Sequence, residues 1–389
     1  MKNDDFMRRA LALARRGYGT TSPNPMVGAV LVKHGKIIGQ GWHRRAGMPH
    51  AEIEAIGAAR QRGKDPRGAT LHVTLEPCCT RGRTPPCTDA IIAAGIAKVV
   101  VGAMDPNPKH SGRAFELLRR GGIEVARGIL AEDCARLNEA FNHWIVHRRP
   151  FVTVKAAMTL DGRIATSGGE SKWITGTRAR AVGMKLRQGA DAVLVGVNTV
   201  LADDPALTFR PASTAQARGR PKPLRRFILD TMARTPLNAK VISDEFAALT
   251  TIVVSPAAPN SRVSALKKRV TVLVAPILEG GARTRVAPGV LRTTRRPVFD
   301  LPRLLARLGS ENVTHLLVEG GGETNAFFLL GRQAQRVVFF YAPRILGGIT
   351  ARKAVAGDGV KNLSDAIQLQ DMDWRRIGED LMMTARVAA

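Results

Sequence analysis

Short apolar runs alternate with segments of amphipathic helical pattern along almost the whole chain, and the alternation starts again after Arg148-Arg149-Pro150. Alternation of strand and helix is typical of α/β folds, in which helices cover a sheet. A residue that precedes proline is disfavoured in a helix, so the helix expected up to His147 ends here. With 389 residues, the chain can form two cores of ordinary size. We therefore expect two α/β domains, over residues 1–148 and 149–389.

The spacing of the apolar residues predicts the individual elements. In the first half, we expect strands over 26–32, 71–75 and 99–103 and helices over 4–16, 51–61, 87–94, 114–120 and 131–147. In the second half, we expect strands over 151–158, 192–197, 226–230, 251–254, 270–274 and 315–319 and helices over 177–188, 301–308 and from about residue 323. Two stretches, 212–223 and 279–297, lack periodicity and are rich in Gly, Pro and Arg, so we expect surface loops there.

The composition, with 44% hydrophobic and 23% charged residues, is typical of a globular protein. No apolar stretch approaches the roughly 18 residues that span a bilayer, and arginines interrupt the first apolar residues, so we expect neither a membrane helix nor a signal peptide. These features predict a cytoplasmic protein, and they are compatible with a homo-oligomer. The formal charge of +27 favours acidic partners such as phosphorylated small molecules. With 5% aromatic residues, the chain is poorly equipped for base stacking, which disfavours nucleic acid as a partner.

Three potential zinc ligands fall at the starts of expected helices or just after an expected strand. His50 and Glu52 open one helix, Cys78 follows the strand over 71–75, and Cys87 opens another helix. One imidazole and two thiolates supply three of the four tetrahedral positions of zinc and leave one for water, which is the geometry of a catalytic site. Glu52, two residues from a ligand, is placed to carry protons. This arrangement is typical of zinc nucleobase deaminases, in which the Glu is not a ligand.

The other two cysteines, Cys79 and Cys134, have simpler interpretations. Cys79 follows Cys78 directly, so its side chain is expected to point elsewhere. Cys134 lies midway along an expected helix, where a free cysteine behaves as a small apolar residue. Since we expect a reducing compartment, a disulfide framework is not expected either.

Longer segments carry a more specific resemblance. TSPNPMVGAVLV (21–32), GWHRRAGMPHAE (41–52), LEPCCTRGRTPPC (75–87) and DPNP (105–108) resemble the deaminase domain of the bifunctional deaminase/reductase family of riboflavin biosynthesis. Eight residues separate Cys78 from Cys87, whereas ordinary cytidine and tRNA-adenosine deaminases usually have two at this place. In the second half, KAAMTLDGRIA (155–165), SKWITG (171–176), LRQGADAVLVGVNTVLADDPALTFR (186–210) and LLVEGGGETN (316–325) resemble the reductase domain of the same family, which is similar to dihydrofolate reductase.

The resemblance implies a cytidine-deaminase-like three-layer α/β domain followed by a dihydrofolate-reductase-like domain. It implies deamination of a diaminopyrimidinone that bears ribose 5-phosphate, and then reduction of the ribosyl group to ribityl with NADPH. One zinc ion per chain would be held by His50, Cys78 and Cys87, and Glu52 would move protons. Asn24 and Arg83, the latter in the loop between the two cysteines, would border the pyrimidine.

In the reductase half, the same resemblance assigns two sets of binding residues. The residues implied to contact NADPH are Ala157, Trp173, Thr199, Asp203, Thr231, Gly321, Gly322, Glu323, Thr324, Asn325, Ala326 and Phe327. The residues implied to contact the substrate are Ser171, Arg187, Leu207, Arg210 and Glu319. Arginine suits a phosphate, and a strand followed by a glycine turn and a helix start offers backbone N–H groups to the phosphates of a cofactor.

The chain departs from the family pattern at three places. Thr80 and Met184 stand where many relatives have His, and Ala334-Gln335-Arg336 replaces Val-Asp-Glu. Two alternatives accompany the bifunctional enzyme. The first is a base deaminase that acts on RNA or DNA, which would leave the second half unexplained. The second is a deaminase whose second half binds NADPH without reducing anything. Oxidation of the cofactor by the isolated second half would distinguish the bifunctional enzyme from this alternative.

Overall fold

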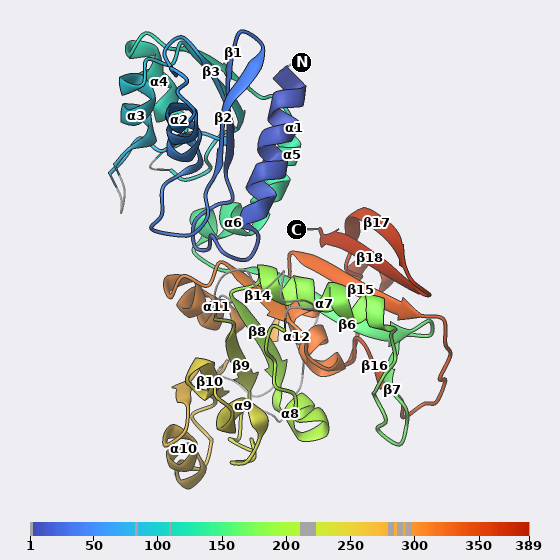
Figure 1. Cartoon of the computed structure of the whole chain (residues 1–389). Helices are drawn as coiled ribbons and strands as arrows, with labels where there is room; N and C mark the ends of the chain where they lie inside the picture. The colour runs from blue at the N-terminus through green and yellow to red at the C-terminus, as the bar shows by residue number, and fades with distance from the viewer. Residues whose placement is uncertain are drawn as a thin grey trace. The chain divides into compact units, whose positions relative to one another are not determined.

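The computed structural model describes residues 3–81, 85–108, 110–210, 223–278, 284–285, 291–292 and 298–388. The chain divides into two compact units, Met1–Arg149 and Pro150–Ala389, which we describe one at a time (Figure 1). The division falls one residue beyond the boundary expected from the sequence. Within the described part of the chain, every helix is too short or too polar to cross a bilayer.

A mixed sheet forms the centre of the first unit. Its strands lie in the order β2-β1-β3-β4-β5; β1 pairs antiparallel with β2 and β3, and β3, β4 and β5 are parallel. The strands are β1 (Gly28–Lys33), β2 (Lys36–Trp42), β3 (Thr70–Leu75), β4 (Lys98–Ala103) and β5 (Glu124–Arg127). The helices are α1 (Asn3–Ala14), the 3-10 turn η1 (Arg15–Gly17), α2 (Ala51–Gln61), α3 (Cys87–Ala93), α4 (Arg113–Arg120), α5 (Ala131–Leu137) and α6 (Glu139–His147).

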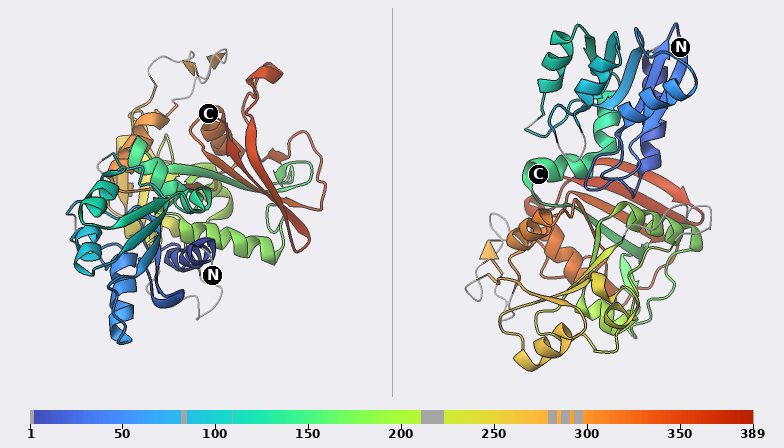
Figure 2. Two further views of the ribbon diagram at one scale, coloured as in Figure 1. Left: turned by 90° about the horizontal axis from the view of Figure 1, so that it is seen from above. Right: turned by 60° about the vertical axis from the view of Figure 1, so that its left-hand side comes forward.

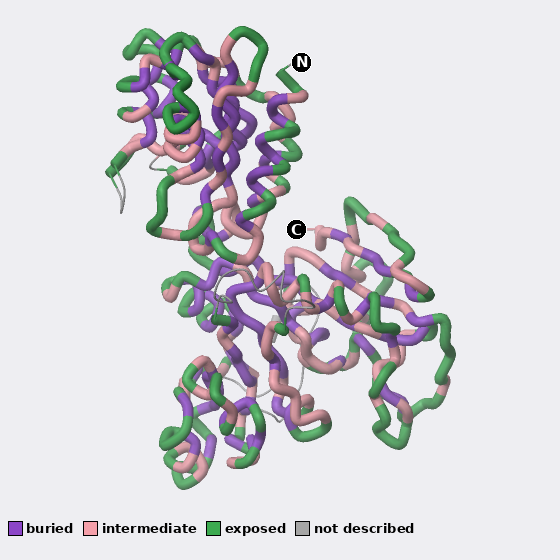
Figure 3. Tube along the Cα trace, viewed as in Figure 1, coloured by how far each residue is buried: buried purple, intermediate pink, exposed green. Residues whose placement is uncertain are grey.

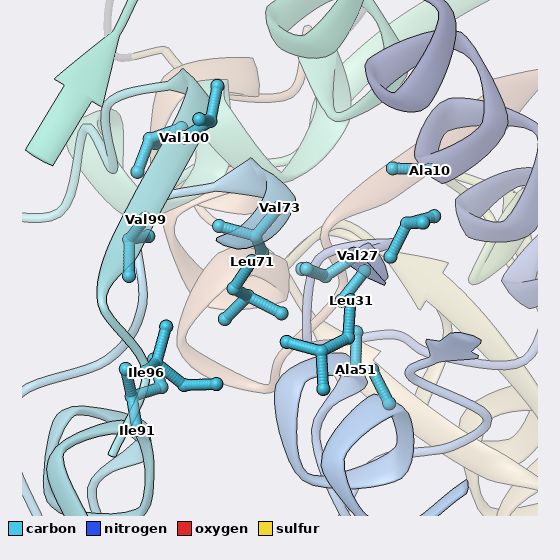
Figure 4. Close-up of a cluster of buried hydrophobic side chains, with 14 of the residues drawn as sticks. Ala10, Val27, Leu31, Ala51, Leu71, Val73, Ile91, Ile96, Val99 and Val100 are labelled. Carbon is cyan, nitrogen blue, oxygen red and sulfur yellow. The ribbon is translucent and has the colours of Figure 1, made fainter. Parts of the chain in front are cut away.

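Helices cover both faces of this sheet, with α1 and α5 on one face and α2, α3 and α4 on the other (Figure 1). Small residues allow the close approach: a Cβ on Gly28 would lie 2.0 Å from the Ala10 carbonyl oxygen of α1. The sheet contributes fully buried side chains such as Leu31, Leu71 and Val99, which belong to one apolar cluster with Ile91 of α3 (Figure 4). This core holds the carboxyl end of β3 against the starts of α2 and α3.

A larger sheet runs through the second unit. The nine described strands lie in the order β11-β10-β9-β8-β14-β6-β15-β18-β17; those from β11 to β15 are parallel, and β18 and β17 add an antiparallel hairpin (Figure 2). They are β6 (Phe151–Thr159), β8 (Ala192–Gly196), β9 (Arg225–Leu229), β10 (Thr250–Val254), β11 (Thr271–Val274), β14 (His315–Val318), β15 (Arg336–Ala342), β17 (Leu369–Ile377) and β18 (Asp380–Val387). Two short pairs are β7 (Arg163–Ala165) with β16 (Arg352–Lys353) and β12 (Thr284–Arg285) with β13 (Leu291–Arg292).

The helices of the second unit also cover both faces of its sheet. They are α7 (Thr177–Gly189), α8 (Val197–Asp203), α9 (Lys240–Ser243), α10 (Asn260–Lys267), α11 (Leu301–Ser310) and α12 (Gly322–Leu330), with 3-10 turns η2 (Ala247–Leu249) and η3 (Leu363–Asp365). One apolar cluster packs α11 and α12 onto the sheet, and two others pack α7, α8, α9 and α10. Figure 3 shows buried residues following the central strands in each unit.

Several elements differ from the sequence expectations. The predicted helix over 131–147 is two helices, because Asn138 breaks it: its Oδ1 accepts the N–H of Met26 at 2.7 Å and its Nδ2 donates to the Met26 carbonyl at 2.9 Å. The sequence patterns missed β2, β5, β7, β15, β16, α8, α9, α10 and the β17/β18 hairpin. The loops expected over 212–223 and 279–297 fall almost entirely outside the described residues.

Candidate active sites

The side chains of the first candidate site come from the ends of three elements. His50 immediately precedes α2, and Glu52 lies in the first turn of that helix. Cys78 follows β3, and Cys87 is the first residue of α3. Because helix N-termini carry partial positive charge, they favour the thiolate form of nearby cysteines.

The three expected zinc ligands lie together. His50 Nδ1 is 3.5 Å from Cys78 Sγ and 3.3 Å from Cys87 Sγ, and the three ligand atoms all lie within 4.8 Å of one another. Hydrogen bonds from Cys87 and from His50 lower the pKa of the Cys78 thiol well below its ordinary value. One imidazole and two thiols match the donor set of catalytic zinc and leave a fourth position open. The residues present therefore fit a zinc ion.

Glu52 is buried beside this cluster, with 3% of its surface exposed. Its Oε2 has no hydrogen-bond partner among the described residues. Burial, and then the charge of Cys78, raises the pKa of this carboxyl to about 7. A buried carboxyl with a spare oxygen and a pKa near neutrality can both accept and donate a proton.

A cavity of about 60 Å³ opens beside Glu52. One water molecule needs roughly 10–15 Å³ on this measure, so the cavity admits water next to the carboxyl. Its lining residues are Asn24, Val27, His43, His50, Glu52, Leu75, Glu76, Cys78 and Asp105. Asn24, expected from the sequence, lies at this cavity, whereas Arg83 lies outside the described residues.

His43 and Asp105 also line the cavity, although the sequence analysis did not single them out. His43 Nε2 lies 3.1 Å from Asn24 Nδ2, and its Nδ1 lies 3.1 Å from the Pro49 carbonyl oxygen. Both residues fall within segments that resemble the family, GWHRRAGMPHAE and DPNP, and that was the available signal.

Glu76 links this cavity to a second segment of chain. Its buried carboxylate accepts the backbone N–H of Asp105 at 3.2 Å, of Gly112 at 2.9 Å and of Ala114 at 3.2 Å. Glu76 precedes Cys78, an expected zinc ligand, by two residues. Its hydrogen bonds therefore connect the segment that carries Cys78 to the loop that carries Asp105.

The two remaining cysteines take no part in the ligand cluster. Cys79 Sγ lies 3.6 Å from His110 Nδ1, and Thr80 Oγ1 lies 3.5 Å from Nε2 of the same ring. Cys134 is fully buried and packs against Gly102. Among the described residues, His50, Cys78 and Cys87 form the only cluster of three suited to a metal.

The second candidate site lies at the carboxyl edge of the parallel sheet. Ala157 is near the end of β6, Thr231 follows β9, and Glu319 follows β14. Thr199 lies in α8, which begins where β8 ends. In open α/β sheets, ligands bind outside the carboxyl ends of the strands.

A charged cluster forms one side of this edge. Arg187 donates from Nε and Nη2 to the two carboxylate oxygens of Glu319, at 2.8 and 3.0 Å, and from Nη1 to the Thr208 carbonyl at 2.9 Å. Lys155 Nζ lies 3.9 Å from Glu319 Oε2. Burial opposes ionisation of Glu319, but the charges of Arg187 and Lys155 outweigh it and lower the pKa of Glu319 to about 2. The carboxylate therefore stays charged at neutral pH.

The other implied substrate residues are placed differently. The side chain of Leu207 is buried in the core, so contact with a ligand would use its backbone. Arg210 is exposed at the end of a described segment. Ser171 Oγ donates to Asp203 Oδ1 at 2.9 Å, which brings an implied substrate residue and an implied cofactor residue together.

The start of α12 presents the backbone N–H groups that the glycine turn predicted. Its first intrahelical bond runs from Asn325 N to the Gly321 carbonyl, so the N–H groups of residues 322–324 come before it. A Cβ on Gly321 would meet only Thr199 Oγ1, at 3.9 Å, which leaves this position open. Asn325 and Ala326 are buried, so their side chains are not available to a cofactor.

Two family models match the chain, one in each unit. Residues 1–103 match the cytidine and deoxycytidylate deaminase zinc-binding region, and residues 150–383 match the RibD C-terminal domain. The second match alone spans more than half of the chain. The chain belongs to the RibD family.

Individual RibD proteins are similar over both units. The RibD protein of Aquifex aeolicus is 44% identical over 97% of this chain and 97% of its own length. The structure of Acinetobacter baumannii RibD is 31% identical, with a TM-score of 0.83, and covers 100% of this chain and 99% of its own. A diaminohydroxyphosphoribosylaminopyrimidine deaminase/5-amino-6-(5-phosphoribosylamino)uracil reductase from Thermotoga maritima is 36% identical, with a TM-score of 0.81, and covers 99% of both chains.

Membership of the RibD family confirms the fold class expected from the sequence. The first unit is a cytidine-deaminase-like domain, and the second is a RibD reductase domain. The second-unit match also accounts for the half of the chain that a nucleic-acid deaminase would leave unexplained.

Proposed function

We propose that the chain catalyses two consecutive steps of riboflavin biosynthesis. The first is hydrolytic deamination of 2,5-diamino-6-(5-phosphoribosylamino)pyrimidin-4(3H)-one, and the second is NADPH-dependent reduction of the ribosyl side chain to ribityl. The observation that carries the proposal is the close group of His50, Cys78 and Cys87 beside the buried Glu52, in a chain that continues into a RibD reductase domain.

In the first unit, His50, Cys78 and Cys87 would hold one zinc ion. When bound, zinc supplies an activated water nucleophile at neutral pH. The buried carboxyl of Glu52 accepts a proton from water and passes it to the leaving amino group, which departs as ammonia. Asn24, and Arg83 as the sequence implies, would position the pyrimidine, whose exocyclic amino group is replaced by oxygen.

In the second unit, the residues named in the sequence analysis would position cofactor and substrate. When bound, NADPH supplies a hydride to C1 of the ribosylamino group after the sugar ring opens to an imine. The N–H groups at the start of α12 would bind cofactor phosphate, and the exposed Arg210 would bind the substrate phosphate. A hydride transfer of this kind depends mainly on positioning.

Two alternatives are less well supported. A nucleic-acid deaminase has no use for the second unit. A second unit that binds NADPH without turnover was suggested by Met184 and by Ala334-Gln335-Arg336. Of these, Gln335 has a structural role here: its Oε1 accepts the Val152 N–H at 2.8 Å, and its backbone bonds Val152 and Val387. Gln335, which departs from the family pattern, therefore connects β6 to neighbouring strands. A reducing cytoplasm suits the free thiols that the zinc site requires.

The direct test supplies purified chain with the phosphoribosylated diaminopyrimidinone, with and without NADPH. Without NADPH, mass spectrometry should detect the deaminated ribosyl product, one mass unit heavier. With NADPH, the ribityl product, heavier by two further units, should appear as NADPH absorbance falls. Binding of NADPH without turnover would support the non-reducing second unit instead.

A further inference from the structure

The turn after β6 carries a carboxylate that the proposed chemistry does not use. Asp161 accepts a hydrogen bond from Thr159 Oγ1 at 2.5 Å, from the Leu346 N–H at 3.2 Å and from the Gly347 N–H at 2.7 Å. The bonds from Thr159, then Gly347, then Leu346 lower the pKa of Asp161 to about 2. Two of these donors lie about 185 residues away in the sequence, so Asp161 ties the turn to the segment that follows β15.

That segment is itself attached to Trp173. Leu160 N donates to the Arg344 carbonyl at 2.8 Å, directly beside Asp161. Arg344 Nη1 then donates to the carbonyl oxygen of Trp173 at 3.2 Å. A path of hydrogen bonds and main chain therefore runs from Asp161 through residues 344–347 to the backbone of Trp173.

Trp173 needs such support because the residue is 63% exposed. The Arg180 guanidinium lies over the ring, 4.6 Å from its centroid, and covers it on one side. Its neighbour Ser171 is held by Asp203. A cofactor binds more tightly to an exposed ring when the position of the ring is fixed before binding.

Asp161 also lines a cavity of about 300 Å³ with Ala354, whose carbonyl oxygen accepts a hydrogen bond from Nδ2 of Asn325 at 2.8 Å. The turn that Asp161 organises is therefore next to an implied cofactor residue as well as linked to Trp173. We infer that Asp161 is a positioning residue of the reductase site, which fixes residues 344–347 and through them Trp173. The inference rests on the proposed function, because Trp173 matters only if the second unit binds NADPH.

The test compares Asp161→Asn with Asp373→Asn in the full chain. Asp373 accepts a hydrogen bond from Arg375 at 2.6 Å on the edge strand β17, so it is a bonded surface aspartate away from this path. Asp161→Asn should raise the KM for NADPH roughly tenfold with little change in kcat, the pattern of lost binding, while Asp373→Asn changes neither. An unchanged KM in Asp161→Asn would refute the inference.

A double-mutant cycle establishes whether Asp161 acts through Trp173. Trp173→Ala should itself weaken NADPH binding, and adding Asp161→Asn should then weaken it by less than twofold further, because coupled residues are not additive. Equal effects in both backgrounds would show that Asp161 acts elsewhere, for instance by direct contact with the cofactor, and would overturn the inference.

Hydrogen exchange separates the inference from the proposed function, since it needs no ligand. Asp161→Asn should speed exchange at residues 344–347 and also at 171–175, while exchange in the first unit stays unchanged. Faster exchange at 344–347 alone would contradict the link to Trp173. Failure of the wild type to oxidise NADPH would count against the reductase activity. Hydrogen exchange would still decide whether Asp161 is linked to Trp173.

Discussion

The guanidinium of Arg226, which has no exposed surface, places both Nη atoms 2.7 Å from the carboxylate oxygens of Asp244. The same group bonds Thr250 Oγ1 and the carbonyl oxygens of Val241 and Ala206. Ala206 precedes Leu207 in the segment implied to bind substrate. Arg226 therefore joins β9 to that segment inside the core.

Asp244→Ala should destabilise the second unit. It leaves a buried guanidinium without its counter-charge, which costs about 3 kcal/mol in comparable cases. Asp373→Ala, which removes an exposed partner of Arg375, should cost less than about 1 kcal/mol. Urea unfolding of the two variants provides the comparison, and equal losses would mean that the buried pair contributes no more than a surface pair.

Zinc content should distinguish the cysteines. The wild type is expected to hold about one zinc ion per chain, and Cys78→Ser or Cys87→Ser should lose it, because a hydroxyl is a much poorer zinc ligand than a thiolate. Cys79→Ser should retain the metal, since Cys79 contacts His110 instead. Elemental analysis of purified variants measures this directly, and zinc retained in Cys87→Ser would refute the ligand assignment.

Glu52→Gln should keep zinc and lose deamination by roughly two to four orders of magnitude, the usual contribution of a general acid/base. The amide cannot accept the proton of the nucleophile. Reduction of separately supplied deaminated intermediate should continue at the wild-type rate, because that chemistry is assigned to the other unit. Loss of both activities together would contradict independent sites.

Two neighbouring glycines should respond in opposite ways. A Cβ on Gly322 would lie 2.1 Å from the Lys353 carbonyl oxygen, so Gly322→Ala should destabilise the unit. Gly321→Val should fold, because its position is open, and should raise the KM for NADPH by crowding the helix start. Thermal unfolding and NADPH kinetics of both variants test the difference. Normal cofactor affinity in Gly321→Val would remove α12 from the cofactor site.

Glu319 should make the second unit sensitive to acid. Its pKa is about 2 in the folded chain, below the ordinary value of 4.5, so its contribution is present above pH 4.5 and is lost as the pH falls toward 2. Glu319→Gln should therefore be clearly less stable than the wild type at pH 7, and the difference should shrink by pH 3. A difference independent of pH would show that charge is not the cause.

The sequence patterns predicted the parts of the fold that depend on local information. The starts of α2 and α3 coincide with His50 and Cys87, and apolar periodicity located both helices. Strand β2 was not predicted because its sequence, KIIGQGW, contains glycines, which have low strand propensity. In the structure, these glycines allow α2 to pack closely on the strand, since a Cβ on Gly39 would lie 2.1 Å from the Ala55 carbonyl oxygen. The β17/β18 hairpin escaped because its outer strand is mostly exposed and polar.

Contacts between distant segments could not be predicted in this way. Asn138 breaks a helix by bonding Met26, 112 residues away, and the sequence around Asn138 does not indicate this partner. The same holds for Asp161 and Gly347, which are 186 residues apart. Resemblance to a family implied that Asn24 borders the substrate, but it said nothing of the contact between Asn24 and His43.

The bonds of Glu76 have a practical consequence for protein engineering. This carboxylate anchors the loop that carries Asp105, and it lies two residues before Cys78. Residues 105–114 therefore cannot be replaced independently of the segment that carries Cys78. Exchanging this loop with one from another deaminase, to redirect base selectivity, would also alter the seating of a metal ligand unless the new loop offers amides at the same three places. Libraries built here should therefore keep Glu76, Gly112 and the start of α4 constant and diversify only residues 106–111.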